Sequence, residues 1–124
     1  MKYSGVEKRR FVRAKFPCKI IIYTPKECTI NTHTENIGVG GVMVIIDQKL
    51  EVSSFVDLEI YLGDKPISCK ARIVWVIDNI NPLSGNSITF DTGIEFYNIS
   101  AKDKKTINDL VEAIVSDKND FRKD

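Results

Sequence analysis

The stretch FVDLEIYL, residues 55–62, decides the fold class, because apolar and acidic residues alternate along it. Val56, Leu58 and Ile60 fall on one side of an extended chain, and the two acids between them fall on the other. Successive side chains of a β-strand point to opposite faces, so a period of two predicts a strand with one buried face. The turn signal Gly63-Asp64 ends this strand.

Runs on both sides of this stretch predict further short strands. They are residues 17–24, 27–35, 42–46, 67–77 and 88–96. The glycine-rich residues 36–41 (NIGVGG) and the polar residues 79–86 separate them as breaks. The period then changes, because Ile107, Leu110, Val111 and Ile114 follow helical spacing, which predicts a helix over residues 101–116.

Six short strands with short connections predict a mainly β, antiparallel domain that closes into a barrel, since closure removes exposed strand edges. The chain of 124 residues is the length of one domain. We expect a basic, flexible arm over residues 1–15, the barrel and the C-terminal helix over residues 16–116, and a polar tail over residues 117–124.

The charge of the chain is nearly balanced but unevenly distributed. There are 18 basic and 17 acidic residues, a net charge of +1, so bulk electrostatics favours neither nucleic acid nor a membrane surface. Residues 1–19, in contrast, contain one acid, Glu7, among many lysines and arginines. A localised cationic segment indicates a small anionic ligand better than the total does, although such runs usually mark solvated surface.

No membrane insertion and no secretion signal are expected, because no apolar run approaches the length of a span and the N-terminus is charged. The three cysteines, Cys18, Cys28 and Cys69, have neither disulfide nor metal-ligand spacing, and each is expected to be a small buried group in a strand. These observations predict a cytoplasmic protein without a metal site or cofactor.

The sequence predicts no catalytic site. Its one histidine, His33, lies between two threonines in a polar strand, where a surface role is expected. Asp57 and Glu59 share a strand face, but exposed acids on an alternating strand are ordinary. Trp75 and Ile77 are expected to pack in the core with Ile73 on the same strand face.

Two short segments carry the chemistry of a binding site. Arg9, Arg10 and Arg13 lie in RRFVR, and each guanidinium can grip phosphate or the guanine edge in two places at once. The second segment, ENIGVGG, offers the amide of Asn36 beside glycines that let a flat ligand approach the backbone. Each segment alone is a weak signal.

Together, in this order and spacing, the two segments resemble the PilZ domain family, whose pattern is RxxxR followed by Asp or Asn-x-Ser-x-x-Gly. The resemblance extends to KARIVWVI, residues 70–77, and to GIEF, residues 93–96, and covers residues 7–115. It implies a six-stranded antiparallel PilZ-like β-barrel with a C-terminal helix. It also implies a non-enzymatic receptor for the bacterial second messenger cyclic di-GMP, with roles in motility or biofilm regulation.

The resemblance assigns a role to each candidate residue. Arg9 and Arg13 hold phosphate and guanine, and Asn36 hydrogen-bonds a guanine edge. Gly41 leaves room for the ring, while Lys8 and Arg10 add phosphate contacts. The basic arm is expected to close over the ligand and to signal to a protein target, and the chain is expected to be a monomer or weak dimer.

One position departs from the family pattern, because Gly38 stands where the family has serine. Losing one hydroxyl hydrogen bond costs about 0.5–1.5 kcal/mol, which weakens binding by about tenfold without abolishing it. Gly38 therefore supports an alternative, a PilZ-like protein–protein interaction module that no longer binds cyclic di-GMP. A third hypothesis, an RNA or single-strand DNA binder, conflicts with the balanced charge.

Overall fold

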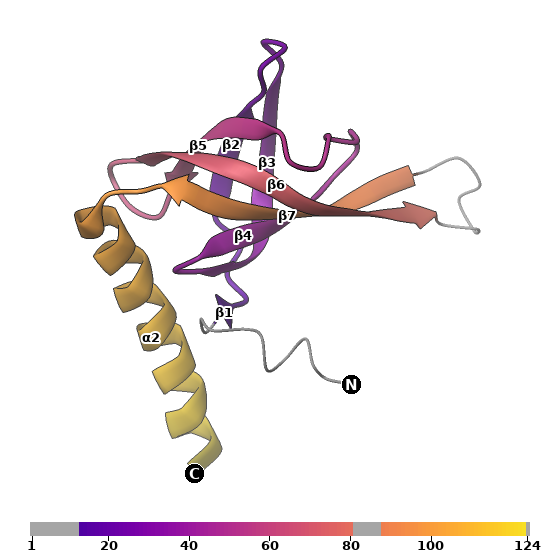
Figure 1. Cartoon of the computed structure of the whole chain (residues 1–124). Coiled ribbons are helices and arrows are strands. Elements are labelled where there is room, and N and C mark those ends of the chain that lie inside the picture. Colours follow the sequence, from indigo (N-terminus) through magenta and orange to yellow (C-terminus); the bar gives the residue numbers. More distant parts are fainter. Residues whose placement is uncertain (1–12, 81–87, 124) are drawn as a thin grey trace.

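The computed structural model describes residues 13–80 and 88–123 (Figure 1). In this part of the chain, strands precede one C-terminal helix. Their bounds are β1 Arg13–Ala14, β2 Lys19–Tyr23, β3 Thr29–Gly38, β4 Gly41–Ile46, β5 Phe55–Tyr61, β6 Ile67–Ile80, β7 Ile88–Asn98 and α2 Ala101–Lys123.

Strands β2 to β7 form a closed, six-stranded antiparallel barrel, as predicted. Neighbouring strands follow the order β3-β2-β5-β6-β7-β4, and the pairing of β3 with β4 closes the ring. The two-residue strand β1 pairs only with β3, where Arg13 lies opposite Gly38 and Ala14 opposite Ile37. The sequence did not predict β1, because two residues are too few to show a periodic pattern.

The alternation in β5 fills the barrel as expected: Val56, Leu58 and Ile60 are each at most 4% exposed. Isoleucine and valine side chains from the other strands of the barrel fill the rest of the interior. Two polar side chains, Thr34 and Thr92, are also buried there. The hydroxyl and the N–H of Thr34 form hydrogen bonds with Phe16 and Cys18, in the segment that leads into β2.

The β6–β7 hairpin extends beyond the barrel (Figure 1). Strand β4 ends where Ile46 pairs with Phe90, whereas β6 and β7 remain paired as far as Ile80 and Ile88. Asn79 and Ile80, predicted to be loop, therefore belong to a strand, because backbone pairing with β7 outweighs their loop-like composition. The rest of the predicted loop, residues 81–86, lies outside the described residues.

The helix α2 begins where predicted and lies across one end of the barrel (Figure 1). The Ser100 hydroxyl accepts a hydrogen bond from the Asp103 N–H at 3.1 Å, which caps the first turn. Ile107 and Val111 are buried, and the helix contacts β1 and β3. The prediction that the helix ends at Ser116 was wrong, since it continues to Lys123 and no glycine or proline interrupts it.

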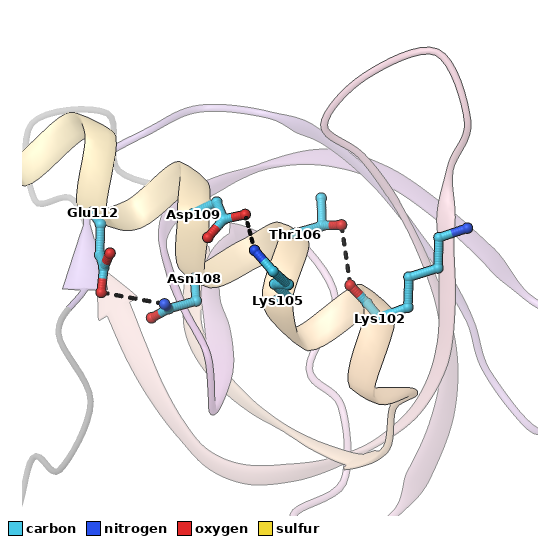
Figure 2. A network of polar contacts seen from close by, with 6 residues as sticks. All are labelled: Lys102, Lys105, Thr106, Asn108, Asp109 and Glu112. Carbon is cyan, nitrogen blue, oxygen red and sulfur yellow. Dashed lines mark hydrogen bonds and ion pairs between the residues drawn. The ribbon is translucent and has the colours of Figure 1, made fainter.

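The solvent side of α2 carries contacts spaced four residues apart (Figure 2). Lys105 Nζ lies 3.0 Å from Asp109 Oδ2, and Asn108 Nδ2 donates to Glu112 Oε2 at 3.2 Å. Each such pair stabilises a helix by about 0.2–0.5 kcal/mol. Neither α2 nor any other helix in the described part of the chain has the length and hydrophobicity needed to cross a bilayer.

The three cysteines are free thiols, and two of them are buried as predicted. Cys28 is exposed, contrary to the prediction, because it lies in the turn before β3 and not in the strand itself. Its N–H donates to Thr24 Oγ1 at 3.2 Å, and its carbonyl accepts from the Thr24 N–H at 3.0 Å.

Candidate ligand-binding site

The segment NIGVGG forms a tight hairpin between β3 and β4. It was predicted to break the strand from Asn36 onward, but β3 continues to Gly38 and β4 begins at Gly41. Asn36 pairs with Met43 and Ile37 with Val42, so only Val39 and Gly40 form the turn. The candidate residues Asn36, Gly38 and Gly41 are therefore held in paired strands and not in a loose loop.

A β-bulge turns Asn36 to the outer face of the barrel. The register with β4 shifts between Thr34 and Asn36, so Glu35 is an extra residue in β3. Thr34 and Ile37 face the interior at 1% and 0% exposure, whereas Asn36 is partly exposed. Strict alternation from Thr34 would have placed Asn36 inside, so the bulge is the reason that its side chain lies on the outer face.

Hydrogen bonds to Thr34 hold the chain that follows the arginine motif against β3, close to Asn36. The Thr34 hydroxyl donates to the Phe16 carbonyl at 2.7 Å and accepts from the Cys18 N–H at 3.1 Å. The Thr34 N–H donates to the Cys18 carbonyl at 2.9 Å. These contacts hold the residues that lead from β1 into β2, and Ala14 of β1 is itself 3% exposed.

The two sequence motifs meet at the pairing of β1 with β3. Arg13, the last residue of RRFVR, lies opposite Gly38 in the backbone register. The structure therefore brings the end of the first motif against the centre of the second. The other basic candidates, Lys8, Arg9 and Arg10, lie outside the described residues.

Strand pairing continues this outer face across β4, β7 and β6. One row of paired residues runs from Asn36 to Met43, Gly93 and Trp75. The neighbouring row passes from Gly41 to Glu95 and Arg72. Three positions of this face, Gly38, Gly41 and Gly93, have no side chain, and all three are buried.

Trp75 lies on this outer face, which corrects the prediction that it packs in the core. A second bulge, between Ile73 and Trp75, reverses the direction of the side chains that follow. Ile73 is fully buried, whereas Trp75 is 37% exposed and Ile77 55% exposed. The indole covers Gly93 so closely that a Cβ on residue 93 would overlap the ring.

Gly41 has a structural role that the sequence did not indicate. A Cβ on this residue would collide with the carbonyl oxygen of Ile94 on β7. The absence of a side chain at Gly41 thus permits the close approach of β4 and β7. This packing explains the glycine without a ligand, so room for a guanine ring remains a prediction.

Glu95 and Arg72, in the same row as Gly41, carry opposite charges. Arg72 Nη2 lies 3.2 Å from Glu95 Oε1, and the two side chains are 43% and 56% exposed. An exposed pair of this kind contributes about 0–1 kcal/mol to stability, so it can rearrange at little cost. Glu95 is an exposed strand residue that strand pairing places beside Gly41, although 54 residues of sequence separate the two on the chain.

A hollow of about 500 Å³ opens on another part of the barrel, between β5, β6 and the start of α2. Tyr23, Asp57 and Lys70 line it, and Asn36, Gly38 and Gly41 do not. Lys70 and Asp57 pair with each other at 3.3 Å and are both exposed. The motif residues Asn36, Gly38 and Gly41 therefore lie outside this hollow, on the outer face of the sheet, which we call the platform. Among the described residues, His, Cys, Asp and Glu side chains do not gather in threes as a metal site requires.

Comparisons with known proteins agree with the fold. The sequence model of the PilZ domain matches residues 7–113. The chain therefore belongs to the PilZ domain family. No curated protein sequence matches the chain.

Solved structures share the fold at low sequence identity. The inhibitor of motility MotI/DgrA from Bacillus subtilis matches with a TM-score of 0.71 at 19% identity, over 86% of this chain and 50% of that one. The PilZ domain of Escherichia coli YcgR with c-di-GMP matches with a TM-score of 0.71 at 12% identity, over 94% and 98%. MrkH of K. pneumonia in its apo state gives 0.75 at 12%, over 94% and 54%. The chain thus spans about half the length of the motility inhibitor and of MrkH.

Proposed function

We propose that this protein is a receptor for cyclic di-GMP that acts by binding and has no catalytic activity of its own. The observation that carries the proposal is the pairing of Arg13 with Gly38, because it joins the two motifs at one place. The ligand has two phosphates and two guanines. A guanidinium suits both groups, because its planar fork of donors fits phosphate and the O6 and N7 edge of guanine.

The platform beside this pairing carries side chains that suit a guanine base. The amide of Asn36 and the partly exposed indole of Trp75 lie in one row of paired residues. An amide can both donate to and accept from a guanine edge, and an aromatic ring offers a surface for stacking. We assign Arg9, Arg13 and Asn36 the main contacts, with Lys8 and Arg10 adding charge near the phosphates.

We propose further that binding changes the conformation of the N-terminal arm and that a cytoplasmic protein target reads this change. The support is that β1 begins with Arg13, the last residue of the arginine motif, and that α2 contacts both β1 and β3. Strand β1 therefore lies at the junction of the candidate site and the helix (Figure 1). Structural relatives that include an inhibitor of motility and YcgR bound to c-di-GMP are consistent with this proposal.

Calorimetric titration with cyclic di-GMP at near-physiological salt tests the proposal, with GTP and GMP as control ligands. We expect micromolar or tighter binding that Arg9→Ala and Arg13→Ala each abolish or weaken severely. Lys15→Ala is the matched control, since Lys15 is an exposed cation that follows β1 and lies outside the motif.

The absence of both heat and thermal stabilisation at high ligand concentration would overturn the proposal. The alternative would then stand, a PilZ-like protein interaction module whose site has lapsed at Gly38. In that case the double variant Arg9→Ala/Arg13→Ala would leave recognition of a protein partner unchanged with and without the nucleotide.

A further inference from the structure

Glu95 is the carboxylate that strand pairing places beside the two glycines of the hairpin. It lies directly opposite Gly41 on β7, and Gly38 is the last residue of β3 across the turn. Adjacent strands are about 4.8 Å apart, so two strand steps of about 10 Å separate Gly38 from Glu95. Gly41 occupies the intervening strand, so this position contributes no side chain between them.

Among the described residues, one oxygen of the Glu95 carboxylate accepts a hydrogen bond. Oε1 accepts a hydrogen bond from Arg72 Nη2 at 3.2 Å, and Oε2 has no hydrogen bond to any described residue. The side chain is 56% exposed, so a ligand on the platform can reach it. Arg72 balances the negative charge, and the pair therefore repels a dianionic ligand less than a lone carboxylate would.

The chemistry of guanine identifies what such a carboxylate can recognise. The N1–H and N2–H₂ groups of guanine are adjacent donors, and a carboxylate accepts two hydrogen bonds side by side. The motif positions of this chain offer no anionic acceptor, since residue 36 is a neutral asparagine and residue 38 is a glycine. Asp91 is less suitable, because it accepts from Asn79 Nδ2 and pairs with Ile45 in a more distant row.

We propose that Glu95 is a specificity-determining residue of the ligand site, whose carboxylate accepts the N1–H and N2–H₂ donors of one guanine. Arg72 acts as a positioning residue that balances the charge of Glu95 and limits its movement. The inference rests on the proposed function and adds to it a residue outside both sequence motifs. It explains how a site with Asn36 and Gly38 keeps a preference for guanine.

The test compares cyclic di-GMP with its inosine analogue, cyclic di-IMP, which lacks the 2-amino groups. Wild-type protein should bind cyclic di-GMP about tenfold more tightly than cyclic di-IMP, as expected for the loss of one hydrogen bond to a charged acceptor. Glu95→Gln should weaken the binding of cyclic di-GMP by about tenfold and reduce the preference over cyclic di-IMP toward unity. An unchanged melting temperature would show that the exposed substitution leaves the fold intact.

Two control variants separate contact from indirect effects. Arg72→Gln breaks the same ion pair but keeps the carboxylate, so it should weaken both ligands and preserve the preference for guanine. Glu35→Gln alters the exposed carboxylate of the bulge next to Asn36, and it should change neither affinity nor preference.

The outcomes distinguish this inference from the proposed function. If wild-type protein binds neither ligand, the proposed function fails and the inference fails with it. If wild-type protein binds cyclic di-GMP and Glu95→Gln keeps its full preference, the receptor stands and Glu95 is not the guanine acceptor. A loss of preference in Glu35→Gln or in Arg72→Gln of the same size as in Glu95→Gln would also overturn the assignment.

Discussion

Single extra residues decide which side chains lie on the outer face of the barrel near the hairpin. Glu35 in β3 and Val74 in β6 are the residues that the two bulges add, and each reverses the direction of the side chains that follow. Without them, strict alternation would bury Asn36 and Trp75. A slip of one residue moves a whole strand face, so these bulges set the composition of the platform.

Gly41→Ala should destabilise the protein, because the new methyl group would overlap the Ile94 carbonyl. Overpacking of this kind typically costs about 1–3 kcal/mol in free energy of unfolding, measurable by urea denaturation. Gly63→Ala is the matched control, since nothing lies within 4 Å of a Cβ at that position. Equal stability of the two variants would show that β4 and β7 can separate locally at no cost.

Thiol reactivity should distinguish the three cysteines. Cys28 is exposed, whereas burial raises the pKa of Cys18 and, with a smaller effect from Asp103, raises that of Cys69 to about 11. The thiolate is the reactive form, so a disulfide reagent at pH 8 should label one thiol quickly and two slowly. Cys28→Ser should remove the fast phase, and its persistence in that variant would contradict the burial of the other two.

Strand β3 connects the candidate site with the rest of the structure. One edge of it pairs with β2 and then with β1, and the other pairs with β4. The buried Thr34 of β3 forms hydrogen bonds with the chain between β1 and β2, and the C-terminal end of β3 leads into the hairpin with β4. The position of the N-terminal segment therefore depends on the same strand that presents Asn36.

Thr34→Val should loosen this connection while it preserves the shape of the side chain. The change removes the acceptor of the Cys18 N–H and the donor to the Phe16 carbonyl. Leaving such buried groups unsatisfied costs about 1–3 kcal/mol, which a chemical denaturation curve would show. Thr32→Val on the same strand, where no side-chain hydrogen bond occurs, should change stability little. Native stability in Thr34→Val would mean that water replaces both contacts.

The apolar side of α2 should contribute much more to stability than its polar side. Ile107 is fully buried, so Ile107→Ala should lower the free energy of unfolding by about 2–5 kcal/mol. Lys105→Ala removes only the exposed pair with Asp109 and should cost about 0.5 kcal/mol or less. A small effect of Ile107→Ala in thermal denaturation would indicate that the barrel end is stable without the helix.

At the scale of the whole molecule, the sequence predicted the architecture better than the surface. The alternation in residues 55–62, the six strands and the start of the helix at Ala101 are confirmed. These features depend on local periodicity, which a sequence displays directly. The bulges, strand β1 and the exposure of Cys28 depend on pairing between distant strands and on turn geometry, which periodicity does not contain.

Only the part of the candidate site that lies within a short local segment could be predicted from the sequence. The sequence indicated Asn36, Gly38 and Gly41 through a short motif, and the structure holds them in one hairpin. Glu95 neighbours that hairpin only because β7 pairs with β4, so spacing along the chain could not reveal it. The sequence also could not show that Gly41 is required for close packing against Ile94, because Ile94 lies on β7, which is distant along the chain.

Stability of the whole protein should decrease as the pH rises above 9. The pKa values of Cys18 and Cys69 are raised mainly by burial, that of Tyr23 mainly by its hydrogen bond to Glu59, and that of Tyr61 mainly by burial. Each group keeps its proton in the folded chain at a pH where the unfolded chain has lost it. The unfolded chain then binds fewer protons, so the free energy of unfolding falls with rising pH.

The measurement is urea denaturation between pH 8 and pH 11. Glu59 accepts hydrogen bonds from Tyr23 at 2.8 Å and from Tyr61 at 3.2 Å, so Glu59→Gln should reduce the slope. Asp64→Asn is the control, because Asp64 is exposed and is not among the groups that raise these four pKa values. A free energy of unfolding that stays constant over this range would contradict the raised pKa values.

The contact between Trp75 and Gly93 has a practical consequence. The chain has a single tryptophan, so all indole fluorescence arises from the row of residues that also holds Asn36. The ring is 37% exposed, which leaves its emission sensitive to anything that covers the platform. Unlabelled protein therefore carries its own optical reporter, and stopped-flow mixing with a nucleotide can follow events at this face in real time.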